Sequence, residues 1–75
     1  MKYLIEFEYA YFPKGLSAVT LKAVKNQIFE IEMPDDISDL KNIIGDQRDR
    51  WFFKGGVEVE YIYLFVETII SITKL

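Results

Sequence analysis

The chain contains no cysteine and no histidine, and its 75 residues include only two prolines and four glycines. Without cysteine there are no disulfides, no thiolate-based zinc sites and no thiol nucleophiles. Without histidine the side chain that most general-base mechanisms use is missing, and no motif supports serine–lysine catalysis in its place. We therefore expect no catalysis, no metal site and no cofactor.

An excess of either charge is also missing. Nine basic and 12 acidic side chains give a net charge of −3. Because these charges are scattered, they provide no field that would hold a phosphate backbone, which argues against nucleic acid as a partner. Glu67 interrupts the apolar run 61–66 well short of the roughly 20 residues of a membrane-spanning helix. Glu6 lies where a signal peptide needs apolar residues. We expect a cytoplasmic protein without membrane contact.

Apolar and aromatic side chains are abundant: 51% of the residues are hydrophobic, with six Phe, five Tyr and one Trp. This composition is the opposite of that of disordered chains. The length suits one core, so we expect a single domain over residues 1–75. A chain this short buries a smaller share of its surface than a larger domain does. We therefore expect self-association into a homo-oligomer.

The first half of the chain alternates between apolar and polar residues, which is typical of strands. Segments 2–12, 17–25 and 28–33 predict an antiparallel meander with turns at 13–15 and 25–27. Keeping the apolar residues of each strand on one face places Tyr9 opposite Val19 and Phe7 opposite Leu21.

A short helix is predicted next, with Asp35 or Asp36 as its N-cap and Gly45 near its end. Its apolar stripe comprises Ile37, Leu40, Ile43 and Ile44, and should pack on the sheet face that carries Ile5, Phe7, Leu21 and Ile31. An extension to Trp51 keeps helical spacing, although Gly45 and Asp46 argue against it.

The last third of the chain predicts a hairpin of segments 51–53 and 57–61 around a loop at 54–56. An unbroken strand from 57 to 75 would measure about 60 Å, so we expect a turn at 66–68 and a final strand at 69–73. The expected fold is α+β in the order β-β-β-α-β-β-β, as a small single sheet or a partly closed barrel.

Three groups of residues are candidate contact surfaces. The hairpin tip carries Tyr11, Phe12 and Leu16, which either form an exposed patch or fold back as a small core. Apolar side chains on the outer side of the sheet form a first row of Leu4, Val24 and Ile28 and a second row of Phe52, Ile62 and Leu64. Arg48 and Arg50 precede Trp51 and give this segment the composition of interface hot spots, or form a self-paired polar connection that leads into a buried Trp.

These features predict a non-enzymatic protein interaction or regulatory module that acts through apolar and aromatic patches. An inhibitor or accessory factor of a larger macromolecule is a variant of this hypothesis. The alternative is a nucleic-acid-associated protein that uses Lys14, Lys22, Lys25 and the tip aromatics.

Overall fold

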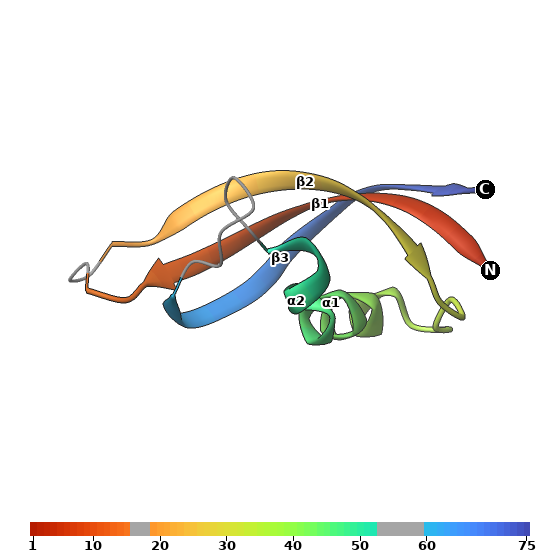
Figure 1. The fold of residues 1–75 in the computed structure, drawn as a ribbon. Coiled ribbons are helices and arrows are strands. Elements are labelled where there is room, and N and C mark those ends of the chain that lie inside the picture. Colours follow the sequence, from red (N-terminus) through yellow and green to blue (C-terminus); the bar gives the residue numbers. More distant parts are fainter. Residues whose placement is uncertain (16–18, 53–59) are drawn as a thin grey trace.

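The computed structural model describes residues 1–15, 19–52 and 60–75. A single three-stranded antiparallel sheet is flanked by two short helices (Figure 1). The elements along the chain are β1 Lys2–Pro13, β2 Leu21–Glu30, α1 Ile37–Asp46, α2 Arg48–Trp51 and β3 Tyr61–Lys74. The strand order is β2-β1-β3, with β1 in the centre. An α+β fold with a three-stranded antiparallel sheet and a short helix is thus confirmed, whereas the expected order of seven elements is wrong for the described residues.

The sheet has two unlike faces. Both helices lie on its inner face, and the strands curve over them (Figure 1). Alternate residues of β1 point to this face and are buried, including Tyr3, Ile5 and Phe7. They pack with Phe29, Leu40, Ile44, Trp51, Phe52 and Val66 in one core. No described helix covers the outer face.

The first hairpin differs from the prediction in its register and in its length. Tyr9 lies opposite Ala23 and Phe7 opposite Lys25, so each partner is four residues later than expected. A shift by an even number of residues leaves every side chain on its predicted face, and for this reason the apolar pattern could not detect it. Leu16–Ala18 of the intervening connection lie outside the described residues.

No turn interrupts the chain at 25–27, so the meander of the first 33 residues is wrong. β2 continues through Gln27 to Glu30, paired with β1 throughout. The Ile31 amide then donates to the Met1 carbonyl at 3.0 Å. The 12 residues of β1 offer hydrogen-bond partners along this whole length, and the segment contains no glycine that would favour a turn.

The expected turn at 66–68 is also absent, because β3 runs without a break from Tyr61 to Lys74. The length argument assumed a rounder domain, but the molecule extends 38 Å along its longest axis. Register irregularities in the β1–β3 ladder lie near Glu67 and Ile70. Such bulges bend a strand, which lets β3 follow the curvature of the sheet. One open sheet forms from the described strands, not a partly closed barrel.

Helix α1 begins as predicted. The Asp36 side chain accepts hydrogen bonds from the Ser38 amide at 3.0 Å and from the Ser38 hydroxyl at 2.8 Å. These bonds hold the pKa of Asp36 below its usual value. Leu40 and Ile44 are fully buried, as the stripe predicts, whereas Ile37 is 54% exposed. The helix passes Gly45 and ends at Asp46.

A second helical turn, α2, replaces the predicted strand at Trp51. The Phe52 amide donates to the Arg48 carbonyl at 2.7 Å and closes this turn. Both Trp51 and Phe52 are buried. A strand would point neighbouring residues to opposite faces, whereas the end of a helix can direct both toward the core. The predicted loop at 54–56 lies outside the described residues.

Candidate interaction surfaces

An aromatic cluster on the inner face, formed by Phe7, Tyr9, Tyr11, Trp51 and Phe52, buries some of the predicted contact residues. Trp51 lies edge-on to Phe7 and Tyr9, with ring centroids 4.9 and 4.8 Å apart. Its indole N–H donates to the Ile44 carbonyl at 2.9 Å. Phe52 meets Tyr11 edge-on at 4.8 Å. Burial raises the pKa of the Tyr9 hydroxyl, and the neighbouring Tyr11 adds to this effect.

The second predicted row is therefore not one surface. Phe52, expected outside, is a core residue with 5% exposure. Leu64 is half-buried against the same core. Ile62 is the exception, with 74% of its surface exposed.

The residues of the first predicted row all lie on the outer face, although Val24 is opposite Glu8 and not beside Leu4. Leu4 and Ile28 are directly opposite one another in the β1–β2 ladder. Val24 lies four residues before Ile28 on β2 and points to the same face, because side chains alternate with a period of two. Their exposed fractions are 36% for Leu4, 55% for Val24 and 54% for Ile28. These three residues, which we call the β2 apolar patch, are exposed as expected.

The predicted hairpin tip is divided between the two faces. Tyr11 is half-buried on the inner face, where it packs on Phe52. Phe12 is half-buried on the outer face, with its ring 6.3 Å from that of Tyr63. Tyr63 in turn lies 5.6 Å from Phe65. For Tyr11 the folded-back alternative therefore describes the structure, while Leu16 lies outside the described residues.

This outer aromatic group, Phe12, Tyr63 and Phe65, was not singled out from the sequence. Its signal was present in the alternation of Tyr63 and Phe65 with Leu64 and Val66. The expected turn at 66–68 would have ended this alternation, whereas β3 continues through it.

Polar groups occupy the middle of the outer face. The Lys22 ammonium lies 3.1 Å from the Glu67 carboxylate, reaching from β2 to β3 across the central strand. The hydrogen bond and positive charge of Lys22 hold the pKa of Glu67 below its usual value. Ala10, opposite both Lys22 and Phe65, is fully buried between the two outer strands. Because the Ala10 side chain is only a methyl group, the Lys22 side chain can pass over β1 at this position to reach Glu67.

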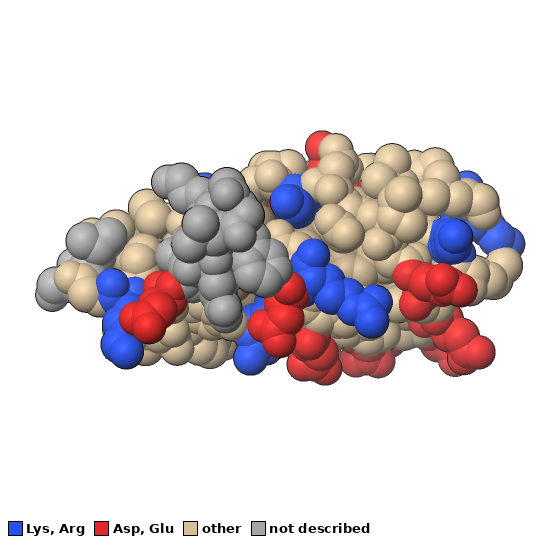
Figure 2. Space-filling view, viewed as in Figure 1, with Lys and Arg blue, Asp and Glu red and all other residues tan. Residues whose placement is uncertain are grey.

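The two arginines lie on α2 and are exposed. Arg48 donates from Nε to the Tyr61 hydroxyl and from a terminal nitrogen to the Gly45 carbonyl at 3.3 Å. Neither Arg48 nor Arg50 forms an ion pair with another described residue. Figure 2 shows basic side chains between acidic ones over much of this view, with acidic side chains predominating along its lower edge.

The three lysines of the nucleic-acid alternative do not share a surface. Lys14 lies 3.7 Å from Glu60, and Lys22 is paired with Glu67. Lys25 lies opposite Phe7 and therefore points to the inner face, away from Lys22. Lys22 and Lys25 therefore point to opposite faces of the sheet.

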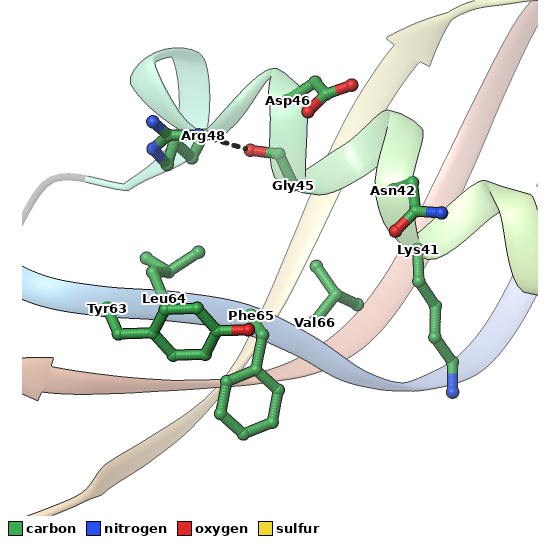
Figure 3. A pocket seen from close by; sticks show the side chains of 9 residues that line it. All are labelled: Lys41, Asn42, Gly45, Asp46, Arg48, Tyr63, Leu64, Phe65 and Val66. Atoms are coloured by element: carbon green, nitrogen blue, oxygen red, sulfur yellow. Dashed lines mark hydrogen bonds between the residues drawn. The ribbon is translucent and has the colours of Figure 1, made fainter.

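A shallow cleft of about 200 Å³ separates α1 from β3 (Figure 3). Leu64 and Val66 point from β3 toward the helix, while Lys41 and Asn42 hang from α1 over the opening (Figure 3). Its charged side chains are Lys41, Asp46 and Arg48. Two of these three are basic and one is acidic.

Within residues 1–15, 19–52 and 60–75, no group of three acidic side chains is placed to hold a metal ion. No helix of this described part is long and apolar enough to cross a membrane. Comparisons of the chain with protein-family models, with curated proteins and with solved structures find no match.

Proposed function

We propose that the protein is a non-enzymatic protein interaction module that self-associates through the β2 side of its outer sheet face. One observation carries the proposal: both helices lie on the inner face, and the β2 apolar patch on the other face is left 36 to 55% exposed. Apolar side chains that are grouped on a sheet face and lack a covering layer are typical of interaction sites.

The total surface supports the same conclusion. The chain exposes 5185 Å², compared with about 4,800 Å² for an average folded monomer of this mass. A second copy that covers part of the outer sheet face would bring the exposed area per chain closer to the average.

The apolar patch alone is too small to hold two copies together. Complete burial of an exposed Val, Leu or Ile side chain contributes about 1.5 to 3 kcal/mol, so finishing the burial of a half-exposed one contributes about 1 kcal/mol. Six such side chains, three from each copy, would contribute about 6 kcal/mol, while association costs about 4 to 15 kcal/mol. Tight association therefore needs additional contacts next to the patch.

The proposal is tested by the double substitution Val24→Lys and Ile28→Lys. Both side chains lie outside the core, so the fold should persist, while lysines on the patch should shift the protein toward monomer. The substitution brings the net charge from −3 closer to zero, so general repulsion cannot explain a loss of association. Light scattering after size exclusion measures the mass, and circular dichroism checks the fold.

Ile37→Lys is the matched control. Ile37 is 54% exposed, like Ile28, but lies on α1. The control should associate as the wild type does. Equal association of the double variant and the control would refute a role of the patch.

A further inference from the structure

Strand β2 forms one edge of the sheet and is unusually regular. Among the described strands it pairs only with β1, and its ten consecutive residue pairs show no bulge. The other edge, β3, carries register irregularities, which blunt an edge against pairing with another chain. β2 also contains neither proline nor glycine. The β2 edge is thus a continuous template for another strand.

The backbone groups that face this edge can be identified. The Ile31 amide donates to Met1 of the β1 segment, so the backbone of Ile31 faces β1. Hydrogen-bonding direction alternates along a strand. The odd-numbered residues of β2 therefore bond to β1, and the even-numbered residues present their N–H and C=O groups at the free edge. These residues are Lys22, Val24, Asn26, Ile28 and Glu30.

The side chains of the same five residues all point to the outer face, and their order is self-complementary. The residues two positions from Asn26 on either side, Val24 and Ile28, are aliphatic. Those four positions away are charged. The two charged residues, Lys22 and Glu30, have opposite signs. Two antiparallel copies centred on Asn26 would place Lys22 against Glu30 and Val24 against Ile28.

We propose that two copies of the chain pair along their β2 edges, antiparallel and centred on Asn26, to form one continuous six-stranded sheet. This inference rests on the proposed self-association and specifies its geometry. The two β2 apolar patches merge across the two-fold axis, with Leu4 of each copy beside Ile28. The pairing supplies backbone hydrogen bonds next to the patch, which the apolar contacts alone lack.

Neighbouring registers are less favourable. Sliding the copies by two residues in one direction places Lys25 directly against Lys25 of the second copy. Sliding them by two residues in the other direction places Val24 against Glu30. Like charges in opposite positions destabilise a strand pair, and matched apolar or opposite-charge pairs stabilise it. Of these three registers, only the one centred on Asn26 satisfies both conditions.

Lys22 can serve both contacts that it would have. Its ammonium carries three donors, of which the Glu67 carboxylate at 3.1 Å needs one. No ion pair of Glu30 occurs among the described residues. In the proposed dimer, Glu30 of each copy therefore lies opposite Lys22 of the other copy.

Amide hydrogen exchange tests the pairing. The amides of Val24, Asn26 and Ile28 face the free edge, so they should exchange freely in dilute monomer. At concentrations where the protein is dimeric, their protection should rise by at least about tenfold. Face-to-face stacking of two sheets would bury the same side chains but leave these edge amides unbonded. A dimer whose edge amides stay unprotected would overturn the edge-to-edge pairing and leave the proposed self-association intact. A protein that is monomeric at all concentrations would refute both the pairing and the self-association.

A single introduced cysteine gives an independent test, because the chain has none of its own. In the proposed register Asn26 faces Asn26 of the second copy at a Cα separation of about 5.5 Å, within the range of disulfides. Asn26→Cys should therefore form a linked dimer under mild oxidation. Ser71→Cys, exposed on β3, is the control and should link at least about tenfold more slowly. Equal rates for the two variants would contradict the pairing.

Discussion

Trp51 is the residue through which α2 is held against the sheet, and Trp51→Phe tests that contact. The substitution removes the indole N–H that donates to the Ile44 carbonyl at 2.9 Å. That carbonyl keeps the hydrogen bond from the Gln47 amide at 3.1 Å, so no buried acceptor is orphaned. The loss should therefore be that of one hydrogen bond, about 1 kcal/mol.

The smaller ring adds a packing loss. Replacing indole by phenyl leaves a void of about 40 Å³, which costs about 1 kcal/mol at about 24 cal/mol per Å³. Edge contacts with Phe7 and Tyr9 can persist, because a phenyl ring retains that geometry. The expected loss is about 2 kcal/mol in total, which lowers Tm by roughly 8 to 16 °C in a domain of this size.

Urea unfolding followed by far-UV circular dichroism measures this loss without relying on tryptophan fluorescence. Both proteins are compared at one concentration, because self-association makes stability concentration-dependent. Tyr63→Phe is the control, since Tyr63 is 57% exposed on the outer face; its stability should change by less than about 0.5 kcal/mol. A Trp51→Phe variant as stable as this control would refute the packing of α2 on the sheet.

Two further substitutions test the helix start and the outer face. Asp36→Ala removes the cap of α1 and should lower Tm at neutral pH, unlike Asp35→Ala. The folded-state pKa of Asp36 is lowered from its ordinary value of 3.8, so the stability that the cap contributes is fully present above pH 3.8 and is lost as the pH falls through the lower folded-state pKa. The Tm curves of the wild type and of Asp36→Ala, measured against pH, should therefore converge at low pH. A constant difference between them would contradict the cap. Ala10→Leu should cost about 1 to 3 kcal/mol in urea unfolding because Lys22 and Phe65 enclose the site. Thr73→Leu, exposed on the same face, should cost much less, and equal losses would contradict this enclosure.

The sequence predicts the faces of the elements better than their partners. Alternation correctly placed Ile5 and Phe7 in the core and Val24 and Ile28 outside. Local chemistry placed the cap at Asp35 or Asp36, of which the structure has Asp36, because a capping carboxylate needs only the next turn of chain. These features depend on period and on near neighbours, both of which are visible in the sequence.

Register and strand length could not be obtained in the same way. A four-residue slide of β2 preserves every face, so only the length of the connection and long-range pairing determine it. The unbroken course of β3 depends on the 12-residue length of β1 as its partner. Phe52 was misplaced for a related reason: helical spacing does reach Trp51, but Gly45 and Asp46 argued against a helix there, and the single turn of α2 changes the period just before Phe52.

Sedimentation equilibrium of the wild-type chain tests the central claim, self-association through the uncovered side of β2, most directly. We expect the mean mass to rise from that of one chain, 8.8 kDa, toward twice this value as the concentration increases from about 1 to 100 µM. A single species of one-chain mass across the whole range would contradict the account.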